Sequence, residues 1–183
     1  MTWTPRLACE NDIPALEGLI PLSVRILQAA YYSSAQMEAA IGPVFGVDWQ
    51  LIRDGTYFVV EHEDKIAGCG GWSRRKTLFG GDRGRAGEDE QLDPKHDSAR
   101  IRALFVHSSW ARQGIGRSIL TACERAALEA GFQKAELVAT LAGEPLYASF
   151  GYTVAGRYEA PMTDGLSLPV VRMTKLLKAM PQH

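Results

Sequence analysis

The sequence predicts a single α/β domain with a mixed β-sheet, spanning residues 1–183. Three observations lead to this fold class. Helix-like and strand-like segments alternate along the chain, two strand-like segments flank a polar turn, and the longest helical segment carries its apolar residues on one stripe. Neither an internal repeat nor a second-domain boundary interrupts this pattern, so we expect one core.

The first segments predict a short strand and then helices. Residues 4–8 are extended in character, and Asp12 stands just before Ile13-Pro14, where proline is tolerated in the first helical turn. Apolar residues at helical spacing continue to Leu27, although Pro21 should bend or split this helix. Shorter helices are expected at 34–41 and 48–53.

The next segments predict a hairpin. Strand-favouring residues 56–60 lead into the polar turn Glu63-Asp64-Lys65, and residues 66–72 return as the partner strand. Glycines in that second strand suggest a bulge or the close approach of another backbone. Residues 73–98 then lose regular pattern, and their glycines and charged side chains predict a long exposed loop.

The second half of the chain predicts strands alternating with helices. The longest helix is expected at 114–130, because apolar residues recur on one face and Gly131 stands where a left-handed residue ends a helix. The other expected elements are strands at 99–107, 135–140, 152–158 and 168–177 and a short helix at 143–149.

Composition excludes several classes of protein. A formal charge of −1 offers no general attraction to nucleic acid or to an anionic membrane. The apolar runs are far shorter than a membrane span, and residues 1–6 lack the basic and apolar regions of a secretory signal. Three distant cysteines indicate neither a disulfide framework nor a metal cluster. We therefore expect a cytoplasmic protein that binds a small ligand and no metal.

The most informative segment is a turn that contains two glycines. Leu104-Phe105-Val106 leads into Arg112-Gln113-Gly114-Ile115-Gly116-Arg117, and a long helix starts there. Helix N-termini present unpaired N–H groups, and glycines let a phosphate approach them. Since Arg112 and Arg117 add positive charge, the segment fits a pyrophosphate cradle.

Two other phosphate-binding patterns fit less well. A dinucleotide fold would place a third glycine where Ile119 stands, and a P-loop would follow a glycine with Lys and then Ser or Thr. A simpler interpretation is that Gly114 and Gly116 only ease a tight turn from strand to helix.

The ordered set of segments resembles the GNAT superfamily of acetyl-CoA-dependent N-acetyltransferases. The resemblance covers nearly the whole chain. It rests on the glycine turn and its preceding strand, and on the following segments: Arg6-Leu7-Ala8 with Asp12, Ile66-Ala67-Gly68-Cys69-Gly70-Gly71-Trp72 and Leu146-Tyr147-Ala148-Ser149-Phe150-Gly151-Tyr152. It implies a mostly antiparallel sheet, flanked by helices, with a central parallel strand pair splayed around acyl-CoA.

The resemblance also implies which residues hold acetyl-CoA. The Leu104 N–H would face the acetyl carbonyl, and the Val106 backbone would pair with the pantetheine amides. The pyrophosphate would lie on backbone N–H groups of the turn, namely those of Gln113, Gly114, Ile115, Gly116 and Arg117. Where the family usually has Gln or Arg, this chain has Ala111, so Arg112 would supply the charge.

Acetyl transfer to an amine needs a proton donor and a proton acceptor. Tyr147 matches the tyrosine that resembling enzymes use as the general acid, whereas the alternative is that it only packs in the core. No base is predicted, because Arg100 stands where many members carry Glu. Candidates by residue type are Glu61, His62, His96, Asp97 and His107. We expect the first four at solvated strand ends and the last in a structural hydrogen bond; a bound water is the remaining option.

Arg100 and Arg102 share one strand face with Leu104. They would either favour a carboxylate-bearing amine or pair with the acidic loop 88–97, and the pairing is our first expectation. The predicted function is transfer of acetyl from acetyl-CoA to a primary amine of a small molecule by direct attack. The alternative is a non-catalytic acyl-CoA-binding or sensor domain. A homodimer is compatible with the exposed sheet edges.

Overall fold

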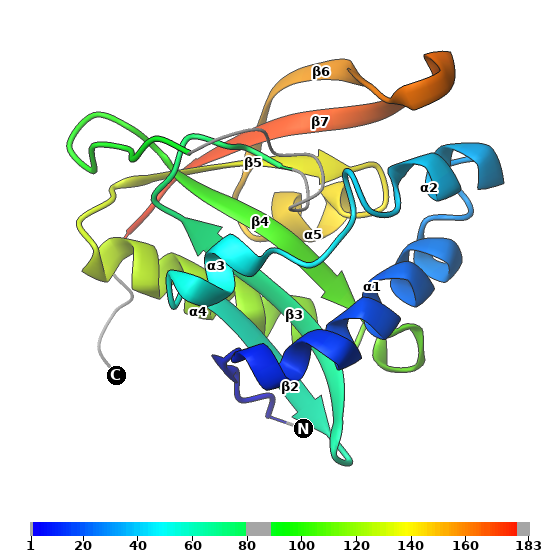
Figure 1. The fold of residues 1–183 in the computed structure, drawn as a ribbon. Coiled ribbons are helices and arrows are strands. Elements are labelled where there is room, and N and C mark those ends of the chain that lie inside the picture. Colours follow the sequence, from blue (N-terminus) through cyan, green and yellow to red (C-terminus); the bar gives the residue numbers. More distant parts are fainter. Residues whose placement is uncertain (1, 80–88, 179–183) are drawn as a thin grey trace.

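Seven strands form one sheet in the computed structural model, which describes residues 2–79 and 89–178 (Figure 1). The strands are β1 (Arg6–Leu7), β2 (Tyr57–His62), β3 (Lys65–Ser73), β4 (Ala99–Val106), β5 (Lys134–Thr140), β6 (Thr153–Pro161) and β7 (Ser167–Leu176). Their order is β1-β2-β3-β4-β5-β7-β6, in which β4 and β5 are parallel and every other pair is antiparallel. The predicted mixed, mostly antiparallel sheet with one central parallel pair is confirmed.

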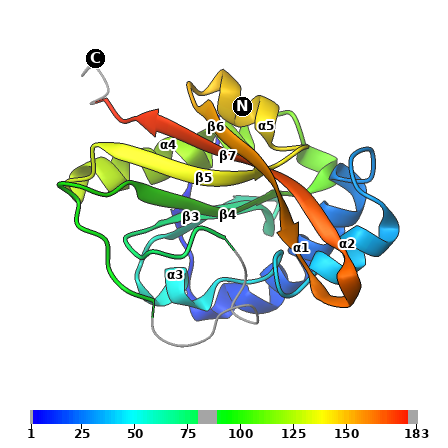
Figure 2. The ribbon, with the colours of Figure 1, turned by 90° about the horizontal axis from the view of Figure 1, so that it is seen from above.

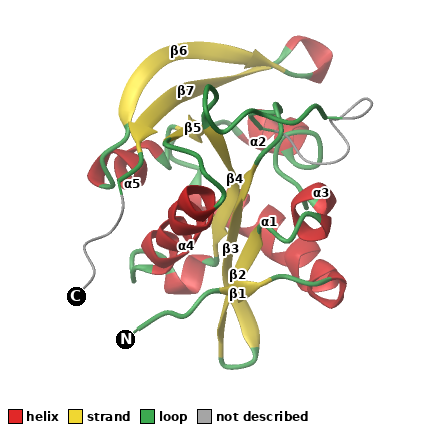
Figure 3. Cartoon of the chain, turned by 90° about the vertical axis from the view of Figure 1, so that its left-hand side faces the viewer, coloured by secondary structure: helices red, strands yellow, loops and turns green. Residues whose placement is uncertain are grey.

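Helices cover both faces of this sheet. They are α1 (Ile13–Leu27), α2 (Ser34–Ala40), α3 (Trp49–Arg53), α4 (Ile115–Glu129) and α5 (Glu144–Ser149). Figure 3 shows α4 and α5 on one face and α1, α2 and α3 on the other. Each face has its own apolar cluster, because the helices bury one stripe each against the sheet. Within the described residues, no helix has both the length and the apolarity to cross a bilayer.

The longest predicted helix, α4, follows its apolar stripe closely. Ile115, Ile119 and Cys123 are fully buried, since residues four apart lie on one face of a helix. Gly131 has a φ of +94° and donates its N–H to the Leu128 carbonyl, which ends the helix. The expected C-terminal left-handed glycine is therefore confirmed.

Helix α1 is the first difference from expectation. Of the two outcomes expected at Pro21, a bend or a split, the split does not occur, because α1 runs unbroken from Ile13 to Leu27. Proline removes one N–H and so frees the carbonyl of Glu17, which lies on the exposed side of the helix. Apolar residues on both sides of the proline, Leu16 and Val24 among them, are fully buried and keep both halves on the sheet.

The segment between β3 and β4 is the second difference. Its described flanks are not an exposed loop: Arg75 bridges to Gln91, and the Lys76 N–H donates to the Glu90 carbonyl at 2.9 Å. Leu92 is only 8% exposed. Buried side chains scattered among charges leave no periodic pattern, so this packing is invisible in the sequence. The rest of the predicted loop, residues 80–88, lies outside the described residues.

The parallel pair opens where the sheet is most irregular. β4 pairs with β5 only at Ala99–Ala135 and Arg100–Glu136, and the two strands part beyond that point. On its other side, β4 has a bulge: Gly70 of β3 faces both Ala103 and Leu104, and Ala103 has a φ of +55°. The bulge expected near the β3 glycines is confirmed. The middle of β4 is therefore unpaired on the β5 side and irregularly paired on the β3 side.

The tip of the β6–β7 hairpin lies beside the ends of α1 and α2 (Figure 2). Tyr32, which follows α1, donates its hydroxyl to the Pro169 carbonyl at 2.7 Å and accepts the Leu141 N–H at 3.0 Å. These bonds join the end of α1 to β7 and to the end of β5. Tyr32 therefore holds the end of α1 against β7 and against the end of β5.

Candidate active site

A cavity of about 110 Å³ lies where β4 and β5 part. Leu104 of β4 and Tyr147 of α5, which the sequence singled out separately, line it together. The remaining lining residues are mostly apolar, including Val44, Phe45, Leu78, Phe79, Phe105, Val138, Leu146, Leu168 and Val170. The polar side chains among them are those of Gln28, Arg102 and Thr140. Small ligands bind in cavities of this kind, where a few polar groups interrupt an apolar lining.

The first turn of α4 offers unpaired backbone donors. Gly114 precedes the helix with a φ of +91°, and the first intrahelical bond runs from the Ser118 N–H to the Gly114 carbonyl at 3.0 Å. The N–H groups of Ile115, Gly116 and Arg117 therefore have no acceptor within the helix. Glycine has no side chain to cap them, whereas Ser33 and Asp48 cap α2 and α3. This end of α4 suits an anion.

Gly116 joins this helix end to the cavity. A Cβ at that position would lie 2.9 Å from Leu146 Cδ2, 3.7 Å from Leu104 Cδ2 and 3.9 Å from Val106 Cγ2. The glycine of α4 thus lies next to side chains of β4 and α5. A side chain here would press on Leu146, which lines the cavity.

The remaining residues of the turn lie at the surface. Arg112 has an exposed side chain and a φ of +66°, and Gln113 and Gly114 are exposed beside it. The Arg117 guanidinium lies over the Phe150 ring, 5.2 Å from its centroid. Both arginines are therefore outside the cavity, near the positive end of α4.

Tyr147 is a buried residue of the cavity wall. Its side chain is 9% exposed and packs edge-on against Tyr152, with ring centroids 5.9 Å apart. Burial raises the pKa of the Tyr147 phenol well above its usual value, and the nearby Cys123 adds to this effect. The phenol consequently keeps its proton at neutral pH. By contrast, burial raises the pKa of Cys69 to about 12, so that thiol is no nucleophile.

Comparison with known proteins identifies the family of the chain. The sequence model described as the acetyltransferase (GNAT) domain matches residues 53–154, more than half of the chain. The chain belongs to the GNAT acetyltransferase family. No curated protein matches it.

Solved GNAT structures share the fold over nearly the whole chain. A GCN5-related N-acetyltransferase from Rhodopseudomonas palustris is 20% identical with a TM-score of 0.71, covering 97% of each chain. The yncA structure from Salmonella typhimurium, which contains acetyl-CoA, is 17% identical with a TM-score of 0.66, covering 100% of this chain and 98% of the other. A ribosomal-protein-alanine N-acetyltransferase from Brucella melitensis is 21% identical with a TM-score of 0.64, covering 95% and 99%.

One contact of the glycine-containing turn was missed by sequence reasoning. The Trp3 indole N–H donates to the Gln113 carbonyl at 2.7 Å. Trp3 also packs edge-on against His62, and His62 packs edge-on against Trp110, with centroids 5.4 and 5.2 Å apart. His107 completes this aromatic group against Trp110 at 4.6 Å. No local pattern links Trp3 to the turn, because the two are far apart in the sequence.

The candidate bases do not line the cavity. Glu61 bonds Arg6, and His62 lies in the aromatic group. His107 accepts the Ser109 N–H at 3.1 Å, as expected for a structural histidine. His96 is exposed, and Asp97 accepts the Asp93 N–H at 2.7 Å. Among the described residues, no group of His, Cys, Asp and Glu could hold a metal ion.

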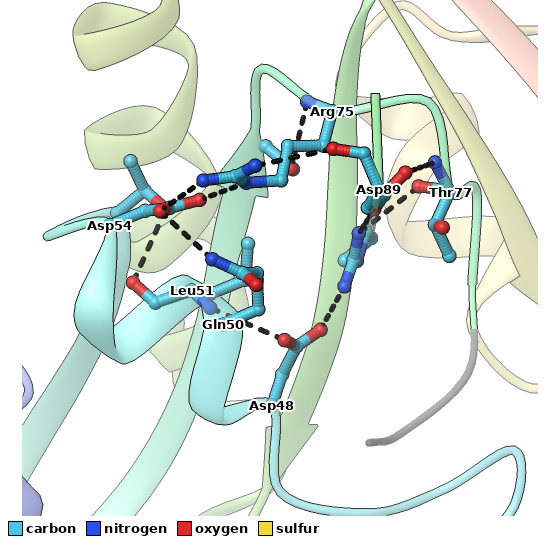
Figure 4. A network of polar contacts seen from close by, with 10 residues as sticks. Asp48, Gln50, Leu51, Asp54, Arg75, Thr77 and Asp89 are labelled. Atoms are coloured by element: carbon cyan, nitrogen blue, oxygen red, sulfur yellow. Dashed lines mark hydrogen bonds and ion pairs between the residues drawn. The ribbon is translucent and has the colours of Figure 1, made fainter. Parts of the chain in front are cut away.

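The two strand arginines are held by carboxylates. Arg100 pairs with Glu136 of β5 at 3.1 Å. Arg102 pairs with Asp48, donates to the Thr77 carbonyl at 3.1 Å and lies 3.7 Å from Asp89 (Figure 4). The expected pairing with the acidic loop therefore applies to Arg102 through Asp89, whereas Arg100 finds its partner on β5. The same network includes the Arg75–Asp54 pair, 2.8 Å apart, which attaches the β3–β4 segment to the end of α3.

Proposed function

We propose that this GNAT protein is an N-acetyltransferase that transfers acetyl from acetyl-CoA to a primary amine of a small molecule by direct attack. The observation that carries the proposal is that Leu104 and Tyr147 line one cavity, while Gly116, at the uncapped start of α4, lies against Leu146 and Leu104 of its wall. The acetyl-CoA found in the yncA structure supports the choice of co-substrate.

The residues at the start of α4 fit the diphosphate of that co-substrate. The N–H groups of Gln113, Gly114, Ile115, Gly116 and Arg117 would hold it, and Arg112 and Arg117 would add positive charge. Gly116 supports this fit, since a Cβ there would meet Leu146 at 2.9 Å. The Val106 backbone would pair with the pantetheine arm beside the bulge in β4.

Leu104 and Tyr147 would act at the reacting carbon. Acetyl-CoA supplies an activated thioester, and attack by the amine places negative charge on the carbonyl oxygen. A backbone N–H of Leu104 aimed at that oxygen stabilises the charge without reorganisation. As the C–N bond forms and the C–S bond breaks, Tyr147 gives its phenolic proton to the thiolate. The phenol carries this proton throughout the neutral range. The amine loses its proton to water, and water returns a proton to the Tyr147 phenolate.

One observation favours a second candidate function. Arg100 occupies the place of the usual base, and none of the described residues lining the cavity is Asp, Glu or His. This would suit a non-catalytic acyl-CoA sensor. A panel of primary amines with acetyl-CoA, read by release of free thiol, separates the two, with calorimetric binding of CoA in parallel. Turnover of at least one amine is expected; tight CoA binding without any turnover would favour the sensor.

We also propose that the enzyme works in the cytoplasm. Cys9, Cys69 and Cys123 are all unpaired thiols, and Cys9 is exposed. An exposed free thiol is typical of a reducing compartment. Fractionation of cells followed by the free-thiol assay would test this location.

A further inference from the structure

The cavity beside Leu104 borders both faces of the sheet. Tyr147 belongs to the apolar cluster under α4 and α5, whereas Phe45 and Leu168 belong to the cluster under α1, α2 and α3 (Figure 3). All three residues line the cavity. This is possible because β4 and β5 part beyond their first two paired residues. The cavity therefore lies between the two clusters.

The side of the cavity next to α4 and α5 is the one that we assign to acetyl-CoA. Leu104, Leu146 and Tyr147 lie on that side, and Gly116 of α4 is in contact with the first two. An amine must reach the acetyl carbon from a direction that the thioester arm leaves free. The opposite side of the cavity is therefore the space for the acceptor.

The accessible side chains on the opposite side are hydrocarbon. Val44, Phe79 and Val138 line the cavity, pack against the cluster of that side and are only half-buried. They come from three separate segments: the α2–α3 connection, the β3–β4 segment and β5. Covering such apolar surface is the main favourable contribution when a ligand excludes water from it. These side chains thus favour an acceptor with an apolar group.

The polar side chains of the lining add little accessible surface. Gln28 is 7% exposed, and the Arg102 side chain is 1% exposed. The Thr140 hydroxyl accepts the Gly143 N–H at 3.1 Å, at the end of β5. The partly accessible hydrocarbon side chains therefore determine what the acceptor contacts on this side.

Phe45 lies between this cavity and a second one. The second cavity, of about 390 Å³, lies beside α1, and Phe45 lines both. Its ring packs edge-on against Phe105, with ring centroids 6.0 Å apart. A turn holds its backbone, because its N–H donates to the Ala40 carbonyl at 2.9 Å and its carbonyl accepts the Gly42 N–H at 2.8 Å. Phe45 is therefore a fixed wall between the two cavities.

We propose, resting on the proposed acetyl transfer, that the acceptor is a small primary amine with a hydrocarbon group of up to about six carbons. The hydrocarbon group packs on Val44, Phe79 and Val138, and Phe45 sets the limit on its length. The chemical step is the one described above, since this side of the cavity selects the amine and takes no part in proton transfer.

The size of the cavity gives the length limit. Its 110 Å³ corresponds to roughly seven to eleven water-sized groups, at about 10–15 Å³ each. The acetyl group with its sulfur takes about four of these and the amine nitrogen about one, on the same scale. The remainder leaves room for roughly two to six carbons, unless Phe45 gives way to the second cavity.

Straight-chain amines test the proposal. With wild-type enzyme and saturating acetyl-CoA, kcat/KM per unprotonated amine should rise at least about twentyfold from ethylamine to pentylamine, since each buried methylene contributes about fourfold. It should fall at least about fivefold from pentylamine to octylamine. Equal values for ethylamine and pentylamine would overturn the hydrocarbon assignment, and equal values for pentylamine and octylamine would overturn the length limit.

A change at Phe45 tests the wall between the cavities. Phe45→Leu should raise the ratio of octylamine to pentylamine turnover at least fivefold, because the shorter side chain opens a way to the second cavity. Phe132→Leu is the matched control, since Phe132 is 1% exposed and packs on Trp72, outside the lining of the cavity. An unchanged ratio in folded Phe45→Leu protein would refute the role of Phe45.

A change at Val44 tests the apolar contact at constant volume. Wild-type enzyme should prefer isobutylamine at least tenfold over 1-amino-2-propanol, in which a hydroxyl replaces one methyl group. Val44→Thr makes the same replacement in the protein and should reduce this preference at least threefold. Val154→Thr on β6, at a position 46% exposed and outside the cavity lining, is the control. Equal rates of wild type on the two amines would overturn the proposal, and an unchanged preference in Val44→Thr would remove Val44 from the acceptor site.

Failure of the proposed function would look different. In that case no amine would be acetylated, although CoA would still bind. Calorimetric titration of pentylamine and ethylamine into the CoA-loaded protein then tests the acceptor side by itself. Pentylamine should bind at least about twentyfold more tightly and with a negative change in heat capacity, the mark of apolar burial. Equal binding of the two amines would overturn the inference without reference to turnover.

Discussion

Trp3 and Gln113 stand 110 positions apart in the sequence, yet a 2.7 Å hydrogen bond joins the indole N–H of the first to the carbonyl of the second. The bond holds the residue that precedes Gly114, at the start of α4. Trp3 itself packs on His62 at the end of β2. The N-terminal segment therefore braces the turn that we assign to the diphosphate.

Trp3→Phe should weaken CoA binding while it leaves the chemical step intact. The ring is kept and the N–H is lost, so the turn loses one hydrogen bond of about 1 kcal/mol. We expect the Kd for CoA to rise about fivefold and kcat at saturation to stay unchanged, measured by calorimetry and by thiol release. Trp49→Phe, a change in α3 and away from the turn, is the control. Unaltered CoA affinity in Trp3→Phe would show that the brace is not needed.

Gly116→Val should block CoA binding. Its Cβ would meet Leu146 at 2.9 Å, and the two methyl groups would extend toward Leu104 and Val106. We expect affinity to fall at least about a hundredfold, or roughly 2.7 kcal/mol, in calorimetric titrations. Gly156→Val on β6 is the matched control, because no atom lies within 4 Å of a Cβ there. Normal affinity in a folded Gly116→Val protein would place the diphosphate elsewhere.

Tyr147→Phe should lower kcat about a hundredfold, the lower range for loss of a general acid, with little change in CoA affinity. Because the pKa of Tyr147 is raised, its phenol stays protonated as the pH rises to 9. The wild-type rate should therefore not fall over that range through loss of this proton. Tyr152→Phe removes a neighbouring buried hydroxyl that does not line the cavity, and it should retain kcat. Equal rates for Tyr147→Phe and wild type would remove Tyr147 from the mechanism.

The Arg6–Asp12 pair should make stability depend on acid pH. Its hydrogen bonds with Arg6 lower the pKa of Asp12 from 3.8 to about 2. A carboxyl whose pKa is lower in the folded state stabilises the protein above the unfolded pKa, and this contribution is lost as the pH falls from about 4 to about 2. We expect it to be about 1–2 kcal/mol, since Arg6 is partly exposed.

Urea unfolding at pH 6 and pH 3 measures this dependence. Asp12→Asn should be less stable than wild type at pH 6, and the difference should shrink at pH 3. Glu38→Gln breaks an exposed ion pair with Arg25 and should change stability little at either pH. A difference between Asp12→Asn and wild type that is the same at both pH values would contradict the assignment.

Much of the fold follows from local patterns. The order of helices and strands, the glycines at 114 and 131 that bound α4, and the bulge near Gly70 were all indicated by residues close in sequence. The effect of Pro21 was predicted less well, because buried residues on both sides of it outweigh one lost hydrogen bond. The exposure predicted for the flanks of the β3–β4 segment is also wrong, because their ion pairs join residues from separate elements, which no local pattern shows.

The sequence by itself determined the element order, the apolar face of α4, the unpaired amides at its start and the tyrosine four residues before Gly151. These properties come from backbone geometry and periodicity, which act over a few residues. Only the tertiary structure decided that Trp3 braces the turn, that Asp48 and Asp89 lie beside Arg102, and that Leu104 and Tyr147 line one cavity. Such contacts depend on how distant segments pack, because hydrogen bonds and charges act through space and not along the chain.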